Sequence, residues 1–155
     1  MMHDRDRCVF CRIADKKVKA FVVHEDEHIL AFLDIHPRVE GHTLVIPKIH
    51  AETLLDLPSG EINPLFLGVR KVSEILLSAF KTKTLTVGIN HGDVEGEKWV
   101  PHLHVHLLPR SLRDGGGSIQ TVVHVEDQRP IEDMHALIIK TLKNNLPRNQ
   151  KAAGE

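Results

Sequence analysis

The chain has no tyrosine, few other aromatic residues and only two cysteines among its 155 residues. Two cysteines cannot build the disulfide framework of a small secreted domain. No apolar run approaches the roughly 18–20 residues that cross a bilayer, and no apolar signal core follows Met1 to Arg7. Lysine and arginine total 20 against 21 aspartates and glutamates, so a generally basic surface for nucleic acid is absent. These absences predict a soluble, cytoplasmic protein that binds neither membranes nor nucleic acids.

The length predicts a single folded domain, because roughly 100–200 residues build one core. We expect this domain to cover residues 1–147 and the polar segment 148–155 to be a disordered tail. Hydrophobic residues at 41% and charged residues at 26% are ordinary for a globular domain. Histidine is the exception, since 12 imidazoles in so short a chain indicate a chemical use, although simple solvation is the usual explanation for any one of them.

The spacing of apolar residues predicts an α+β fold, in which an antiparallel meander sheet surrounds one long helix. Apolar residues recur at intervals of three and four between Ser59 and Phe80, which is typical of an amphipathic helix, whereas β-branched runs elsewhere are typical of strands. Strands are expected at residues 21–24, 29–33, 43–46, 84–89 and 102–108, and further helices at 8–15, as a helix or a turn, and from Pro130 to about Asn144.

Three histidines alternate with apolar residues in the last predicted strand: His102, His104 and His106. Because successive side chains of a strand point to opposite faces, the imidazoles form a row while the residues between them enter the core. Such a row can ligate zinc, or it can supply a nucleophilic nitrogen flanked by groups that fix its tautomer and donate to phosphate oxygens. The plain alternative is the exposed polar face of a strand.

The two cysteines, Cys8 and Cys11, form a Cys-x-x-Cys pair near the N-terminus. This spacing is typical of metal binding or of thiol redox chemistry in a reducing compartment. Redox motifs of the thioredoxin kind follow a strand, and no strand is predicted before Cys8, so we favour zinc. The pair supplies only half of a tetrahedral site, and two further ligands are needed.

Several segments in a fixed order resemble the histidine triad (HIT) superfamily, whose signature is His-x-His-x-His followed by two apolar residues. The resemblance covers roughly residues 8–110 and is carried by Cys8 to Ile13, Phe32 to Pro37, Gly41 to His50 and His102 to Leu108. It implies a HIT-like fold and a homodimer whose long helices and sheet edges pair across a two-fold axis.

The resemblance also implies catalytic roles. His104 would attack the α-phosphorus of a nucleotide and form a covalent nucleotidyl-histidine, which water then hydrolyses. This role requires that a carbonyl or a neighbouring side chain hold the second nitrogen of His104, so that the attacking nitrogen carries the lone pair. His106 would donate to a phosphate or leaving-group oxygen, and His42 would support the triad from a neighbouring strand. A structural histidine satisfied by the backbone is an equally good interpretation of His42.

Nucleotide-binding roles follow from the same resemblance. Asp34 resembles the acidic residue that binds both ribose hydroxyls, for which two carboxylate oxygens are well suited, and Asn90 resembles an amide that contacts phosphate. A solvated turn residue is the alternative for each of them. The predicted nucleotide-binding set is Phe32, Asp34, Ile35, Asn90 and His106.

For the cysteines, some members of the superfamily complete the Cys-x-x-Cys pair with two histidines, here His50 and His102. The implied zinc ligands are therefore Cys8, Cys11, His50 and His102, and the zinc would be structural. His102 would then be a metal ligand and not a catalytic base.

One segment departs from the family pattern. Where many members carry a serine or threonine that donates to phosphate, the segment from Gly96 to His102 has Trp99. Trp99 can stack on a base or anchor the loop, and Lys98 can approach a polyphosphate. Arg110, directly after the triad, is another candidate phosphate ligand, with an ordinary surface arginine as the alternative.

The resulting hypothesis is a HIT nucleotide hydrolase or transferase acting on an adenosine or guanosine 5'-phosphate derivative. Nucleoside phosphoramidates and dinucleoside polyphosphates are both candidate substrates, and the sequence Leu107 to Arg110 is closer to that of the polyphosphate hydrolases. Relatives of galactose-1-phosphate uridylyltransferase are longer and fit less well. The alternatives are an AMP-binding module without turnover and a purely structural zinc protein.

Overall fold

The computed structural model describes residues 4–93, 99–124 and 128–145. The chain divides into two compact units, Met1–Ser118 and Ile119–Glu155, which we describe one at a time. The predicted disordered tail at 148–155 and the predicted phosphate contact of Lys98 lie outside the described residues. No helix in the part of the chain that the structure describes is long and apolar enough to cross a membrane.

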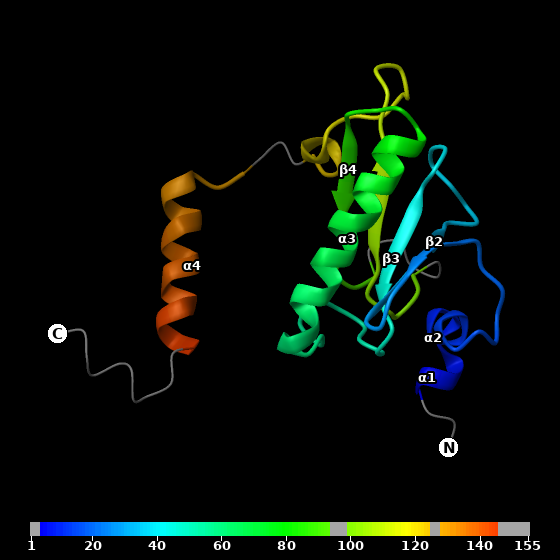
Figure 1. Cartoon of the computed structure of the whole chain (residues 1–155). Coiled ribbons are helices and arrows are strands. Elements are labelled where there is room, and N and C mark those ends of the chain that lie inside the picture. The colour runs from blue at the N-terminus through cyan, green and yellow to red at the C-terminus, as the bar shows by residue number, and fades with distance from the viewer. Residues whose placement is uncertain (1–3, 94–98, 125–127, 146–155) are drawn as a thin grey trace. The chain divides into compact units, whose positions relative to one another are not determined.

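Within the described residues of the first unit, five strands form one antiparallel sheet in the order β1-β2-β3-β5-β4 (Figure 1). The first three strands form the expected meander. The chain then passes through the long helix α3 and forms the edge strand β4 before β5 returns between β4 and β3. The predicted α+β class and antiparallel sheet are confirmed. The strands are β1 (Val22–Glu25), β2 (Ile29–Leu33), β3 (Thr43–Pro47), β4 (Leu85–Gly88) and β5 (Val105–Pro109).

Helix α3 (Ser59–Ala79) covers one face of the sheet (Figure 1). Leu65, Val69, Val72 and Leu76 are buried at intervals of three and four, which confirms the predicted amphipathic helix. The apolar stripe is wider than the face that the helix buries, because other apolar residues of the stripe are about 40% exposed. Three residues that alternate with the histidines enter this core as predicted: Leu103, which precedes β5, and Val105 and Leu107 of β5.

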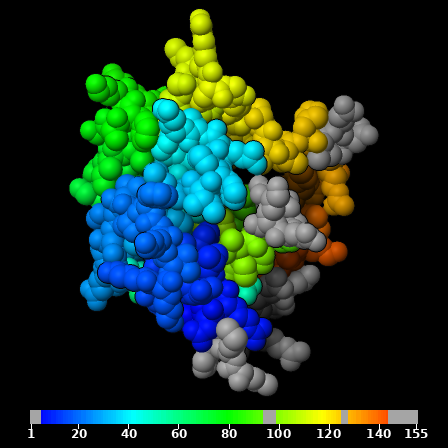
Figure 2. All heavy atoms as spheres, turned by 90° about the vertical axis from the view of Figure 1, so that its right-hand side faces the viewer, coloured from blue at the N-terminus to red at the C-terminus, as the bar shows by residue number. Residues whose placement is uncertain are grey.

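The opposite face of the sheet packs against the short helix α2 (Val9–Ala14), which follows another short helix, α1 (Asp4–Arg7). A second core joins Phe10 of α2 to Phe32 of β2, with 5.4 Å between the ring centroids. Figure 2 looks onto this side of the unit, where the dark blue N-terminal helices lie near the cyan segment that follows β2 and the yellow-green segment around the start of β5. The rings of His102 and His104 meet Phe10 of this second core edge-on.

The predicted strand at 102–108 begins three residues later than expected, at Val105. The correction has a physical cause, because the residues before Val105 use their hydrogen-bonding groups elsewhere. The His102 amide donates to the Val100 carbonyl at 2.7 Å, and the Leu103 amide donates to the Ala51 carbonyl at 2.6 Å. His102 therefore precedes the strand on which it was expected to lie.

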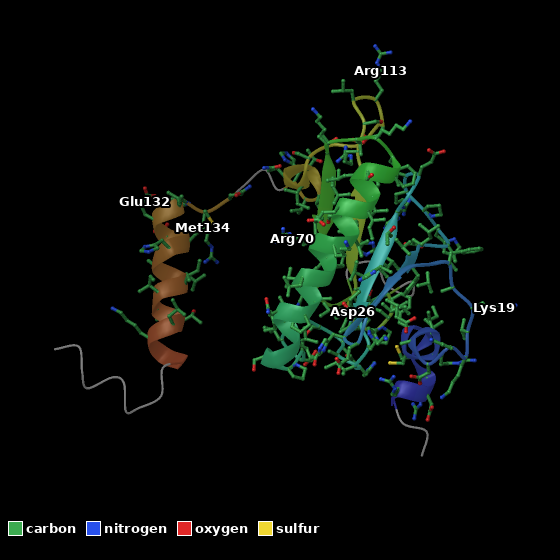
Figure 3. The ribbon with its side chains drawn as sticks, in the orientation of Figure 1. Lys19, Asp26, Arg70, Arg113, Glu132 and Met134 are labelled. Atoms are coloured by element: carbon green, nitrogen blue, oxygen red, sulfur yellow. The ribbon has the colours of Figure 1, made fainter. Side chains whose placement is uncertain are left out.

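The second unit contains a short 3₁₀ turn, η2 (Ile119–Thr121), and helix α4 (Ile131–Asn145). Helix α4 agrees with the helix expected from Pro130 to about Asn144. It carries Glu132 near its start, and its exposed apolar residues include Met134, both labelled in Figure 3.

Gly41 is required by the segment that joins β2 to β3. Its φ is +78°, a backbone conformation that side-chain-bearing residues rarely adopt, and an added Cβ would overlap the Phe80 ring. We expect Gly41→Ala to lower the free energy of unfolding by about 1–3 kcal/mol in urea titrations. Gly60→Ala is the matched control, since Gly60 lies in α3 with no atom near an added Cβ, and it should be neutral or slightly stabilising. Equal stability of the Gly41 and Gly60 variants would contradict this account.

Candidate functional site

The central feature of the candidate site is a linear hydrogen-bond chain through two histidines. The backbone amide of Arg38 donates to Nδ1 of His42 at 3.2 Å, so the neutral His42 ring must carry its proton on Nε2. Nε2 of His42 lies 2.9 Å from Nδ1 of His106 and donates to it. His106 therefore carries its own proton on Nε2, and the backbone amide fixes the tautomers of both rings.

The Nε2 atom of His106 is buried and has no hydrogen-bond partner among the residues that the structure describes. A buried donor without a partner costs free energy, so it is uncommon in folded proteins and calls for an explanation. The hydrogen-bond chain from Arg38 makes this atom a donor. It is therefore ready to bind an oxygen of a ligand without any change of tautomer.

The neighbouring ring, His104, is held in the complementary state. Its Nδ1 lies 2.6 Å from the carbonyl oxygen of His102, to which it donates, and this leaves the lone pair on Nε2. The ring centroids of His104 and His106 are 4.9 Å apart. The site thus places an imidazole with a free lone pair beside an imidazole with a free N–H, which suits attack on a centre whose oxygens need a hydrogen-bond donor.

Burial keeps the His42 and His106 pair neutral. Desolvation lowers the pKa of His42, despite the attraction of the Asp34 carboxylate, whose Oδ2 lies 3.6 Å from Nε2 of His42. Desolvation, assisted by the neighbouring histidines, lowers the pKa of His106 from 6.5 to about 4. At neutral pH the donating state of His106 is therefore the neutral ring and not the imidazolium.

The low pKa of His106 predicts a loss of stability in mild acid. Below the unfolded pKa of 6.5 the unfolded chain takes up a proton, whereas folded His106 stays neutral until about pH 4, so acidification favours unfolding. Between pH 7.5 and 5 this single group should remove about 2 kcal/mol of stability. Over the same pH range, the free energy of unfolding of His106→Gln should fall by about 2 kcal/mol less than that of the wild type, as measured by chemical denaturation. Parallel pH dependences of the two proteins would show that His106 titrates normally in the fold.

The predicted nucleotide-binding residues are only partly brought together. Asp34 lies directly after β2 beside His42, and its Oδ1 accepts a hydrogen bond from the His36 amide at 2.8 Å. Phe32 is buried in the second core at 3% exposure, whereas Ile35 is 76% exposed. Asn90 is also exposed, two residues beyond Gly88, whose Cα pairs with that of His106 across β4 and β5. No hydrogen bond joins Asn90 to the histidines in the described residues.

A hollow of about 340 Å³ opens next to Asp34 and His42. It is formed by the segment that joins β2 to β3, from Leu33 to His42, and so it adjoins the hydrogen-bond chain that begins at the Arg38 amide. The hollow is large enough for part of a small organic ligand. A ligand that entered it would lie against Asp34 and His42.

A second cluster gathers the four predicted metal ligands, Cys8, Cys11, His50 and His102, whose ligand atoms all lie within 4.8 Å of one another. Sγ of Cys8 lies 3.3 Å from Nδ1 of His102, and Sγ of Cys11 lies 3.3 Å from Nδ1 of His50 and 3.4 Å from Nδ1 of His102. Sulfur atoms are visible on the side of α2 that faces the sheet (Figure 3).

The cluster fits a tetrahedral metal site in both dimensions and protonation. Zinc–ligand bonds of about 2.3 Å to sulfur and 2.0–2.1 Å to nitrogen give sulfur–nitrogen edges of about 3.6 Å, close to the distances found here. His102 donates from Nε2 to the Pro47 carbonyl at 2.9 Å, which leaves the lone pair of Nδ1 directed at the two sulfurs. The arrangement can therefore hold a metal ion without any change of tautomer at His102.

Burial sets the protonation of the cluster in the absence of a metal. It lowers the pKa of His102 to about 4 and, together with the neighbouring Cys8, raises the pKa of the Cys11 thiol to about 12. Both side chains are fully buried. A closed site of this kind leaves no open position for a substrate.

The two remaining candidates have different surroundings. Arg110 donates to both carboxylate oxygens of Asp114, at 2.6 and 2.9 Å, and also to Thr86 and to the Gly117 carbonyl. It thus organises the loop after β5, whose tip carries Arg113 (Figure 3), and it is bonded within the fold. Trp99 is partly buried, directly after a segment outside the described residues.

Sequence reasoning gave no role to two groups that the structure places in the site. The Arg38 amide fixes the tautomers of His42 and His106, and a backbone group leaves no signal in residue type. Phe10 lies edge-on to His104, with 5.4 Å between ring centroids. Its position between the two cysteines is the sequence signal that could have identified it, because it connects two of the candidate metal ligands.

Comparison with known proteins gives a consistent picture. The family model described as "HIT domain" matches residues 15–112. An uncharacterized HIT-like protein of Methanocaldococcus jannaschii is 44% identical over 108 residues, which are 70% of this chain and 82% of that protein. The adenosine 5'-monophosphoramidase of Saccharomyces cerevisiae is 29% identical over 138 residues, covering 89% of this chain and 84% of that enzyme.

The fold has solved counterparts as well. The crystal structure of a HIT family protein from Bacillus subtilis is 35% identical and superimposes with a TM-score of 0.74. The match covers 90% of this chain and 97% of that one. The similarity therefore extends over nearly the whole of both chains.

Proposed function

We propose, from the premise that this chain belongs to the HIT family, that it is a nucleotide hydrolase or transferase in which His104 is the nucleophile. The observation that carries the proposal is the pair of complementary tautomers. Nε2 of His104 has its lone pair free, and Nε2 of His106, beside it, has a buried N–H without a partner in the described residues.

The geometry supports a two-step displacement at the α-phosphorus. Nε2 of His104 forms a bond to phosphorus while the bond to the leaving group breaks, and the leaving group departs with that electron pair. A polyphosphate leaves as the anion, whereas the nitrogen of a phosphoramidate takes up a proton from solvent and leaves as the amine. His106 Nε2–H donates to a phosphate or leaving-group oxygen, where negative charge develops. The product is a nucleotidyl-histidine whose ring keeps its Nδ1 proton on the His102 carbonyl.

The second step returns the enzyme to its starting state. Water attacks phosphorus, gives up a proton to solvent and displaces His104 with the electron pair of the nitrogen–phosphorus bond. Because Nδ1 still carries its proton, the departing imidazole is neutral and is a good leaving group. A second nucleophile in place of water would make the reaction a transfer.

The substrate class we propose is an adenosine or guanosine 5'-phosphate derivative, either a phosphoramidate or a dinucleoside polyphosphate. Asp34 beside the 340 Å³ hollow would bind the ribose hydroxyls, with Phe32, Ile35 and Asn90 as further contacts. A named monophosphoramidase among the relatives supports the first class, and the sequence Leu107 to Arg110 supports the second.

We propose zinc for the second cluster, held by Cys8, Cys11, His50 and His102. When bound, it would supply structural cross-linking between the N-terminal segment and the sheet. We also propose that the protein acts in the cytoplasm as a homodimer. The edge strands β1 and β4 give a physical reason for association, because exposed strand edges favour pairing.

The experiment that tests the function is incubation with adenosine phosphoramidate and, separately, with diadenosine polyphosphate, followed by alkaline quenching and intact-protein mass spectrometry. We expect release of AMP and a mass increase of one adenylyl group on His104. The faster substrate identifies the class of leaving group. Neither adduct nor AMP from either compound, in a protein that binds AMP, would overturn the proposal for these substrates.

A second candidate function is nucleotide binding without turnover. Trp99, in place of a hydroxyl residue that would donate to phosphate, is the observation that favours it. This function predicts AMP binding that is unchanged when His104 is replaced, with no adduct in the wild type. Because both functions allow AMP to bind to His104→Ala, the measurement that separates them is the adenylyl adduct and AMP release of the wild type, which are absent under this second function.

A further inference from the structure

Phe10 connects the metal cluster to the candidate nucleophile. It lies on α2 between Cys8 and Cys11, and it is only 8% exposed. Its ring meets those of His104 and His102 edge-on, with centroid distances of 5.4 and 5.9 Å and interplanar angles of 81° and 71°. The segment from Cys8 to Cys11 thus provides two residues of the cysteine–histidine cluster and an aromatic ring that packs against His104.

The orientation of the His104 ring depends on packing by its neighbours. In the described part of the chain, one hydrogen bond holds this ring, from Nδ1 to the His102 carbonyl, and a single bond at one atom leaves the ring able to tilt about it. Phe10 and His106 contact the ring, at centroid distances of 5.4 and 4.9 Å. The direction of the Nε2 lone pair therefore depends on how firmly Phe10 is held.

Phe10 is held by packing against Phe32 in the second core and by the cysteines on either side of it. Helix α2 has six residues, too few to be stable on its own in water. The Cys11 amide donates to Sγ of Cys8, and the two sulfurs converge on Nδ1 of His102. Ligands joined by a metal would fix α2 at both ends of the short segment that carries Phe10.

We infer that Phe10 is a positioning residue through which the metal cluster sets the orientation of His104. The inference rests on the proposed function for its catalytic consequence but not for its structural one. Its test therefore includes a spectroscopic measurement that does not depend on turnover.

The test compares Phe10→Leu with wild type and with Leu30→Val. Leucine keeps an apolar side chain but removes the ring edge that meets His104. Leu30 is the control because it is buried in the same core and lies on β2, two strands away from β5. Long-range ¹H–¹⁵N spectra of the histidine rings report the tautomer and order of His104, and metal analysis reports the occupancy of the cluster.

In Phe10→Leu we expect the metal content of wild type, broadened or shifted His104 ring signals, and a kcat lower by about 10-fold to 100-fold with KM within about 2-fold. Leu30→Val should leave the ring signals and kcat at wild-type values. His104 signals and kcat in Phe10→Leu that match Leu30→Val would overturn the inference. If wild type itself turns over none of the substrates, the proposed function fails, while the spectra still decide the role of Phe10.

Removal of the metal tests whether the orientation of His104 depends on the occupied cluster. Removing the metal from wild type with a chelator should change the His104 ring signals in the same direction as Phe10→Leu, although Phe10 is still present. Unchanged His104 signals in protein shown to be metal-free would overturn the link between the cluster and the nucleophile.

Discussion

Replacing His104 with alanine should reduce AMP release by at least about 10⁴-fold, because loss of a covalent nucleophile removes the reaction path itself. The structure gives this residue the only arrangement, among the described histidines of the site, in which Nδ1 is held by a backbone carbonyl while Nε2 keeps its lone pair next to a donor. The measurement is steady-state release of AMP, together with the mass of the alkali-quenched protein. The adenylyl adduct should be absent from the variant.

Asp34→Ala provides the contrast. Asp34 lies beside His42 and the hollow but does not contact His104, so its loss should weaken nucleotide binding and raise KM while the adduct still forms. His104→Ala should retain AMP binding, since its ring is not part of the hollow. An adduct of undiminished yield in His104→Ala would exclude this residue as the nucleophile and would direct attention to the other imidazoles.

Replacing Cys11 with serine should lower the metal content to well below one ion per chain and reduce the free energy of unfolding by more than about 4 kcal/mol. Cys11 is fully buried, and its sulfur lies within 3.4 Å of Nδ1 of both His50 and His102. Serine is a poor zinc ligand, and its hydroxyl would be buried among groups arranged for a metal. Metal analysis and urea unfolding, with and without added zinc, measure the two effects.

The control is Val9→Ala, which lies next to Cys8 on α2, is 38% exposed and contributes no ligand. It should keep its metal and lose less than about 1 kcal/mol. If the cysteine pair serves thiol redox chemistry instead, the purified protein should contain no metal. If the purified protein contains no metal and its cysteines form a disulfide by thiol counting, the cluster is not a metal site.

The sequence was sufficient to predict the layers of the fold and the face on which the histidines lie. Alternation along residues 102–108 places Leu103, Val105 and Leu107 in the core under α3, and the three-to-four spacing of α3 agrees with its buried face. Periodicity is a property of the chain itself, so one sequence is enough to detect it. HIT membership could be predicted because several segments of the chain carry motifs of the family in a fixed order.

The hydrogen bonds that give each histidine its state could not be predicted. The Arg38 amide and the His102 carbonyl are backbone groups, and every residue has them, so only the fold shows which ones meet a ring. The start of β5 was placed too early for a related reason, since the Ala51 carbonyl competes for the Leu103 amide from a distant part of the chain. Local patterns carry no information about such long-range partners.

Ile35 and Asn90 are both exposed, and no hydrogen bond joins either of them to the histidines in the described residues. Their roles in nucleotide binding therefore stay predictions. Residue type and order specify which strand end a side chain follows, whereas its approach to a ligand depends on loop geometry and on the ligand itself.

His102 belongs to two sites through different atoms: its ring faces the cysteines, and its main-chain oxygen holds His104. A codon change at this position alters the ring but can never delete the oxygen. Substitution of His102 can therefore remove a candidate metal ligand while the acceptor that selects the tautomer of His104 stays in the backbone. The tautomer of His104 is in this respect independent of the side chain at position 102, whereas the orientation of its ring still depends on the packing of Phe10.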